Sequence, residues 1–263
     1  MKPQRIAVSL TALNLPLRQA LRRVEEMDAD GVQFELGRHF TRDDMTESAR
    51  RQLLHELDEL GLGISSLVVP VSRPLADWDG LEARIDGLKQ AMLLAFQLQA
   101  GVVAFRTGRI PADANSPEYE TLCGLLNELA RHANHVGALP SVSWAGEPTQ
   151  AVVDLLANVK DGPLGVNFDP AAVIPSGRSP AAVYSELVDC VNHITIRDAV
   201  RDIDDAVVEV PVGRGEVPWD EFLALTVEAD YRGWMTAART QGDDKAGDVA
   251  RAVKYVRTVL VRG

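Results

Sequence analysis

The chain is poor in cysteine, in aromatic residues and in basic residues relative to acidic ones. Its 263 residues include 2 cysteines and 5% aromatics, and 27 Lys and Arg stand against 38 Asp and Glu, for a formal net charge of -11. A chain this acidic lacks the basic face that nucleic acids require, so we expect no nucleic-acid partner. Cys123 and Cys190 fall in no metal-binding or redox spacing, and we interpret them as reduced thiols.

Long hydrophobic runs are also missing. No segment reaches the ~20 apolar residues of a membrane span, and residues 1–10 lack the apolar run of a signal peptide. We therefore expect a cytoplasmic protein with no membrane partner. Because 46% of the residues are hydrophobic, the chain still has ample material for a large core.

Short apolar runs alternate with longer segments of helical period along the whole chain. Strands are predicted at residues 6–10, 31–36, 64–69, 102–105, 139–144, 164–168, 191–196 and 234–237. Helices are predicted at about 17–27, 43–60, 81–99, 116–136, 149–159, 180–187, 219–229 and 246–260. Residues 207–212 are expected to pair locally, as a hairpin or an extension.

Eight strand–helix units in a chain of this length predict an α/β fold, a (β/α)8 TIM barrel in a single domain over residues 1–263. An open, doubly wound sheet is the alternative. No linker or low-complexity run marks a second domain. In a parallel barrel the functional residues lie at the carboxyl ends of the strands, in the loops that lead into helices.

Five segments, taken in order, resemble the xylose isomerase-like TIM-barrel superfamily. They read GVQFEL at 31–36, VNFDP at 166–170, HITIRD at 193–198, VGRGEVPW at 212–219 and YRGWMT at 231–236. That group holds sugar and sugar-phosphate isomerases and epimerases, inosose dehydratases and relatives of endonuclease IV. The resemblance implies a sugar isomerase or epimerase, but no single segment is specific; the ordered set is.

The resemblance also implies a divalent metal at the ends of the last four barrel strands, with two glutamates that move protons on either side of an enediolate. This chain keeps only Asp169. It has Ser143 and Ala238 in place of the two glutamates, Thr195 in place of a histidine, and Ala172 where a second histidine often follows the aspartate. Divalent ions need several oxygen or imidazole ligands at once. We therefore predict no metal and no other cofactor.

Arginines follow most of the predicted strands. They are Arg38, Arg73, Arg106, Arg109, Arg197, Arg214 and Arg239. Guanidinium groups suit bidentate contacts with carboxylates and phosphates. We predict that Arg106, Arg109, Arg197, Arg214 and Arg239 bind a small anionic sugar or sugar acid, together with Ser143, Trp144 and Thr195. The alternative is that each arginine forms a surface ion pair, such as Arg197 with Asp198 or Asp202, and Arg239 with Asp243 or Asp244.

Three residues are candidate acids or bases: Glu35, His39 and Asp169. Glu35 ends the second strand and is expected to point inward, where it serves as a base, accepts from a sugar hydroxyl or pairs with an arginine. His39 follows in the next loop, as an acid or base or as an exposed loop histidine. Asp169 is expected to pair with an arginine. Asn167 and His193 are interpreted as buried structural groups, and Trp144 either stacks on a sugar or packs between strand and helix.

Two functions remain open from the sequence. The first is an isomerase- or epimerase-like enzyme in which arginines replace the charge of the metal. The second is an inactive relative that binds or senses a metabolite, or that supports an active partner subunit. Self-association is possible in both.

Overall fold

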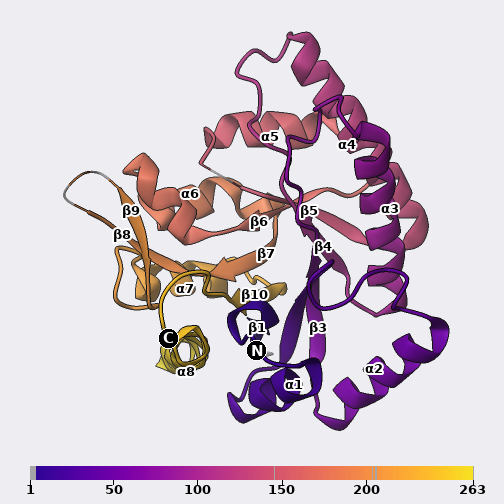
Figure 1. The fold of residues 1–263 in the computed structure, drawn as a ribbon. Coiled ribbons are helices and arrows are strands. Elements are labelled where there is room, and N and C mark those ends of the chain that lie inside the picture. The colour runs from indigo at the N-terminus through magenta and orange to yellow at the C-terminus, as the bar shows by residue number, and fades with distance from the viewer. Residues whose placement is uncertain (1–3, 145, 203, 205, 263) are drawn as a thin grey trace.

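Eight parallel strands close into a barrel, in the order β1-β10-β7-β6-β5-β4-β3-β2, with the helices packed around it (Figure 1). The computed structural model describes residues 4–144, 146–202, 204 and 206–262. The closed ring confirms the predicted (β/α)8 TIM barrel and excludes the open, doubly wound sheet. None of the helices in these described ranges is both long enough and apolar enough to cross a membrane.

The elements agree with the predicted ones to within a few residues. The barrel strands are β1 (Arg5–Ser9), β2 (Gly31–Glu35), β3 (Gly63–Val68), β4 (Val102–Phe105), β5 (Leu139–Ser143), β6 (Gly165–Phe168), β7 (Val191–Ile196) and β10 (Trp234–Ala237). The α-helices are α1 (Leu17–Glu26), α2 (Glu47–Glu59), α3 (Leu81–Gln97), α4 (Pro117–Val136), α5 (Thr149–Asn158), α6 (Pro180–Leu187), α7 (Trp219–Glu228) and α8 (Lys245–Arg262). Short 3₁₀ helices, which the pattern did not predict, are η1 (Leu10–Ala12), η2 (Pro170–Ser176) and η3 (Val188–Cys190).

Capping residues fix the helix ends. The Ser116 hydroxyl accepts a hydrogen bond from the backbone N–H of Tyr119 at 3.2 Å, and Gly137 ends α4 in the left-handed region at φ 82°. Thr46 caps α2 through its hydroxyl in the same way. Helix α2 therefore begins at Glu47, later than the predicted start at residue 43.

The apolar core lies between the barrel and the helices. Phe168 on β6 is fully buried and stacks on Phe222 of α7 with ring centroids 5.8 Å apart, while Tyr184 of α6 meets it edge-on at 5.6 Å. Trp144 stacks on the same ring at 6.0 Å. Each buried side chain of this size contributes about 1.5–3 kcal/mol by burial. The aromatic contacts hold the carboxyl ends of β5 and β6 against their helices.

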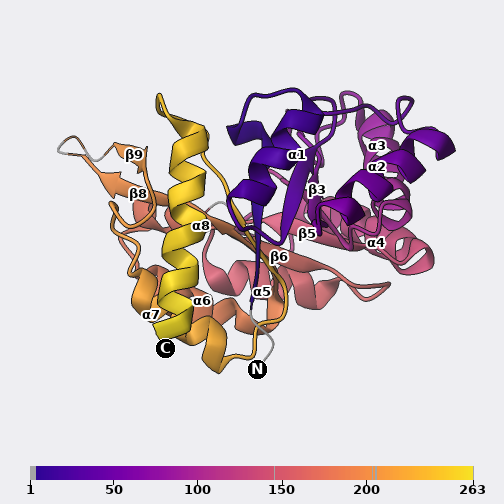
Figure 2. The same cartoon turned by 90° about the horizontal axis from the view of Figure 1, so that it is seen from below.

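A two-stranded hairpin projects from the barrel between β7 and α7. It consists of β8 (Asp198–Arg201) and β9 (Val207–Val210), which pair antiparallel, and it stands clear of the barrel in both views (Figures 1 and 2). This pairing confirms the local hairpin expected at residues 207–212, although β9 ends at Val210.

The Asp198 carboxylate anchors the loop that follows the hairpin. It accepts hydrogen bonds from the backbone N–H groups of Gly213, Gly215 and Val217 at 2.9, 3.1 and 3.2 Å, and from the Trp219 indole at 3.0 Å. Asp198 is fully buried. A β-carbon at Gly215 would lie 2.0 Å from its Oδ1 atom, so this close approach requires glycine.

Replacement of Asp198 by alanine is expected to destabilise the fold by about 3 kcal/mol or more, because it leaves several buried donors without an acceptor. The melting temperature should fall by at least about 6 °C. Asp86→Ala, at an exposed position on α3, is the matched control and should change it little. Equal melting temperatures for the two variants would show that the loop does not depend on this carboxylate.

Candidate functional site

Strand alternation brings several of the predicted site residues together at the mouth of the barrel. The Gln33 side chain donates to Ser66 at 2.9 Å inside the barrel, and Glu35 lies two residues further along β2, on the same side. By the same alternation the inward side at the carboxyl ends of β5, β6 and β7 carries Ser143, Asp169, Thr195 and Arg197. The mouth therefore combines carboxylates, hydroxyls and a guanidinium.

Asp169 and Arg197 form a buried ion pair at the centre of this set. The Arg197 Nε and Nη2 atoms lie 2.8 and 2.6 Å from Asp169 Oδ2, and the N–H of Ala171 donates to Oδ1 at 3.0 Å. The Asp169 and Arg197 side chains are 13% and 23% exposed, respectively, which is too buried for a solvated surface pair. Burial raises the pKa of Asp169, and Arg197 opposes that rise. Asp169 in turn raises the pKa of Arg197.

A second buried cluster lies on the same side of the rim and includes residues that sequence reasoning did not select. Arg239 donates through Nε to Asp248 of α8 at 2.9 Å, and its Nη1 lies 3.7 Å from Glu209 of the hairpin. Glu209 also accepts from the backbone N–H of Thr240 at 3.0 Å. Arg239 is only 8% exposed. Its partners are therefore Asp248 and Glu209 rather than Asp243 or Asp244, and its guanidinium is engaged in holding the rim together.

Glu209 also acts on the central pair, since its charge raises the pKa of both Asp169 and Arg197. Nothing in the sequence near Glu209 marks it as a mouth residue. It reaches this position only because β9 folds back on β8 and pairs with it.

Polar side chains fill the barrel interior below the mouth. His193 is fully buried, with Nδ1 2.8 Å from Asn167 Oδ1 and Nε2 3.0 Å from Thr236 Oγ1. Burial lowers its pKa to about 3, so the ring is neutral near pH 7. Thr236 lies 3.0 Å from the Ser65 hydroxyl on the far side of the barrel. Asn167 and His193 thus occupy the buried structural positions that the sequence indicated.

The side chains of Glu35 and His39 differ in the contacts that they make. His39 Nδ1 accepts from the backbone N–H of Glu35 at 2.9 Å, its ring meets Phe34 edge-on at 5.9 Å, and burial lowers its pKa. The half-buried Glu35 carboxylate makes no hydrogen bond or ion pair within the described part of the chain. Of the two, Glu35 has its side chain free for chemistry.

The remaining predicted arginines lie on the exposed rim. Arg106 directly follows β4, and Arg109 and Arg214 lie in the loops after β4 and β9; all three are exposed and have no ion-pair partner among the residues described.

Trp144 is 5% exposed and donates from Nε1 to the Glu147 carbonyl at 3.1 Å. It packs between strand and helix, one of the two roles considered for it.

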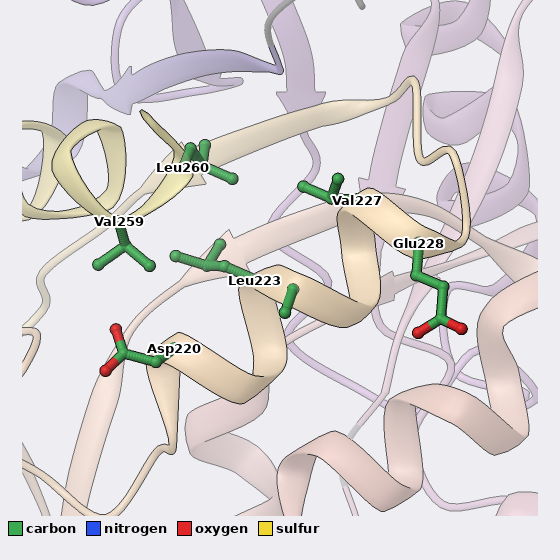
Figure 3. Close-up of a pocket in the computed structure, with 7 residues that line it drawn as sticks. Asp220, Leu223, Val227, Glu228, Val259 and Leu260 are labelled. Atoms are coloured by element: carbon green, nitrogen blue, oxygen red, sulfur yellow. The ribbon is translucent and has the colours of Figure 1, made fainter. Parts of the chain in front are cut away.

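An apolar cavity of ≈ 450 Å³ lies outside the barrel, between α7 and the end of α8 (Figure 3). Leu223, Val227, Val259 and Leu260 line it, and Asp220 stands at its edge. The strand ends do not contribute to it, so it is separate from the mouth.

Across the described residues, no group of three or more His, Cys, Asp or Glu side chains gathers closely enough to hold a metal ion.

The buried, neutral His193 predicts a specific pH dependence of stability. Between its folded pKa of about 3 and the ordinary value of 6.5, the unfolded chain takes up a proton that the folded chain does not. This contribution therefore lowers the free energy of unfolding as the pH falls below about 6.5, by up to about 1.4 kcal/mol per pH unit. Urea unfolding at pH 7.5 and 5.5 should show a smaller loss in His193→Gln than in the natural chain, and an identical loss would contradict the assignment.

Comparisons with known proteins agree with this architecture. The family described as xylose isomerase-like TIM barrel matches residues 21–259. A xylose isomerase domain protein from Planctomyces limnophilus superposes with a TM-score of 0.85 at 20% identity, covering 99% of this chain and 98% of that one. A probable 3-DHS dehydratase, AsbF, from Bacillus anthracis superposes with a TM-score of 0.79 at 15% identity, covering 97% and 99%. At these identities the likeness concerns the fold alone.

In sequence, the chain is 24% identical over 169 residues to inosose dehydratase 2 of Bacillus cereus, an alignment that covers 55% of this chain and 56% of that protein. The chain thus spans about half the length of the relatives that it matches in sequence. The match to the family itself runs over almost the whole barrel. The chain belongs to the xylose isomerase-like TIM-barrel family.

Proposed function

We propose that this chain binds a small anionic carbohydrate, a sugar phosphate or sugar acid, at the barrel mouth, and that it does so without a divalent metal. The observation that carries the proposal is the ion pair of Asp169 with Arg197. The carboxylate that would be the first metal ligand is instead neutralised by a guanidinium, whose Nε and Nη2 atoms contact Asp169 while Nη1 is left as a donor at the centre of the mouth.

The donor chemistry at the mouth does not fit a divalent ion. Asp169 is engaged by Arg197 and by a backbone N–H, and Ser143 and Thr195 offer only neutral hydroxyl oxygens. Ala238 offers only a methyl group. One carboxylate already neutralised by a cation, with two hydroxyls, falls short of the several oxygen or imidazole ligands that such ions require.

The cationic groups at the mouth suit an anion instead. Arg106 comes directly after β4, two residues after Ala104, so strand alternation places the two on the same side. The Arg106 side chain is exposed and has no ion-pair partner within the described ranges. Arg197 is fixed on the inner wall by Asp169, and a preorganised guanidinium loses little freedom on binding. The body of the protein is acidic, with a net charge of -11, so cations left unpaired at one opening select an anionic group there.

The test is ligand binding in the presence of a chelator. D-gluconate, D-glucuronate and D-ribose 5-phosphate should raise the melting temperature in EDTA, while D-ribose and D-fructose should not. Addition of Mg²⁺ or Mn²⁺ in place of EDTA should add nothing. If neutral sugars stabilise the protein only when a metal is present, the proposal is wrong.

Replacement of Arg106 by alanine should weaken binding of the anion by about tenfold or more, because a hydrogen bond to a charged group contributes about 1.5–3 kcal/mol. Arg51→Ala, at an exposed position on α2, is the control. The double variant Arg106→Ala/Arg197→Ala should abolish binding; its melting temperature without ligand is measured first, because Asp169 loses its buried partner. Unchanged affinity in the double variant would refute the anion site.

A second candidate function is proton transfer, and the free Glu35 carboxylate favours it. Isomerases, epimerases and dehydratases of carbonyl sugars share a first step, removal of a proton from the carbon beside the carbonyl, which requires a positioned base. Glu35 is half-buried at the inner edge of the mouth and its oxygens are uncommitted in the described structure. Arg106 and Arg197 would stabilise the enediolate charge that develops.

Proton transfer at Glu35 predicts exchange of a ligand carbon-bound proton in D₂O, measured by NMR. Glu35→Gln should abolish that exchange and leave affinity for the anion nearly unchanged, since the amide keeps the shape of the side chain. His39→Gln should retain exchange. Binding without exchange in the natural chain would identify a binding or sensing protein rather than an enzyme.

A further inference from the structure

One buried amide, that of Asn167, links the two hydroxyls of the mouth to the barrel interior. Its Oδ1 atom lies 2.9 Å from Thr195 Oγ1 and 2.8 Å from His193 Nδ1, and its Nδ2 atom lies 3.2 Å from Ser143 Oγ. Asn167 is 8% exposed and His193 is fully buried, so water does not compete for these bonds. Ser143 and Thr195 are only partly buried and have no other side-chain hydrogen bond within the described chain.

With the Asn167 amide in this orientation, each of its hydrogen bonds has one direction. The amide oxygen can only accept, so the Thr195 hydroxyl donates its one hydrogen to Asn167, and its lone pairs remain available to a ligand at the mouth. The amide nitrogen can only donate, so Ser143 accepts from it and keeps its hydrogen for the mouth. Two chemically similar hydroxyls are thereby made unlike, one an acceptor and the other a donor.

The far side of His193 is consistent with the same directions. Acceptance by Asn167 Oδ1 requires the hydrogen on Nδ1, which leaves Nε2 of the neutral ring as an acceptor. Nε2 lies 3.0 Å from the Thr236 hydroxyl and 3.4 Å from the Ser66 hydroxyl. Ser66 can donate to it, and Thr236 can donate to it when the Ser65 hydroxyl donates to Thr236 rather than to the Val32 carbonyl 3.1 Å away. Gln33 supplies a donor to Ser66 at 2.9 Å, which leaves the Ser66 hydrogen available.

We propose that this buried circuit sets the hydrogen-bond polarity of the mouth, with His193 and Asn167 as positioning residues and with Thr195 and Ser143 as the residues that contact the ligand. The inference rests on the proposed ligand site. It narrows the ligand to one that offers a hydroxyl donor to Thr195 and a carbonyl, carboxylate or phosphate oxygen to Ser143. A polyhydroxylated acid meets both demands, whereas a ligand with a deoxy or keto carbon at the Thr195 position leaves that acceptor unpaired.

The circuit also predicts that its donor and acceptor roles can be exchanged only all together, not at one hydrogen bond alone. If the Asn167 amide is turned over, its nitrogen faces Thr195 and His193 and its oxygen faces Ser143. His193 then has to accept at Nδ1 and carry its hydrogen on Nε2. The tautomer of one histidine therefore reports the direction of every bond in the circuit.

The test is a long-range ¹H–¹⁵N spectrum of the full chain labelled on histidine. The chain has 5 histidines. Single replacements of His39, His55, His132 and His135 by glutamine assign four of them, and His193 follows without being altered. We expect His193 to show a protonated Nδ1 and an unprotonated Nε2 near pH 7. A protonated Nε2 with a bare Nδ1 would overturn the proposal.

A matched pair of variants checks that Thr195 belongs to the circuit. Thr195→Val removes the second donor to Asn167 Oδ1 and should shift the Nδ1–H signal of His193, while Thr195→Ser should leave it in place. An unmoved signal in both variants would exclude Thr195 from the circuit. These measurements need no ligand, so they can fail while the anion site stands, and the anion site can fail while they succeed.

Discussion

The burial of Asp169 against Arg197 governs the character of the mouth. A lone carboxylate at this depth would be expensive to ionise, and a nearby cation is the usual compensation. In this chain the cation belongs to the protein, placed at the end of the adjacent strand, four residues after His193 and on the same inward side. The pair therefore holds a guanidinium at the opening, beside the carboxylate that follows β6.

The barrel interior imposes a second constraint. Its inward positions hold small and polar side chains from strands on opposite sides, such as Ser66 on β3 and His193 on β7, which come within 3.4 Å although their strands are not neighbours in the ring. Polar groups sealed from water are stable only when each finds a partner. That requirement fixes the orientation of the buried polar groups. Asn167, which is hydrogen-bonded to His193, in turn orients the hydroxyls of Thr195 and Ser143 at the mouth. A stability requirement deep in the barrel thus becomes a chemical property of its opening.

Much of the fold was predictable because the signals are local. Short apolar runs marked all eight barrel strands, and Ser116 with Pro117 marked the start of α4. The site was harder to predict because ion pairing is decided in three dimensions. Arg197 selects Asp169 at the end of the neighbouring strand rather than Asp198, the next residue in the chain, and Arg239 selects Asp248 on the next helix. Glu209 was missed for the same reason, because its position depends on a hairpin turn and on contacts with Thr240, 31 residues away, and no spacing rule links the two.

The contacts of Glu209 with Thr240 and Arg239 restrict the motion of the rim. The loop after β7 and the loop after β10 are joined by Glu209 to Thr240 and Arg239, and Arg239 is joined in turn to α8 through Asp248. Two segments that carry separate parts of the rim are thereby coupled into a single stiff body. Any opening or closing of that side of the barrel must carry the hairpin and the start of the last helix with it.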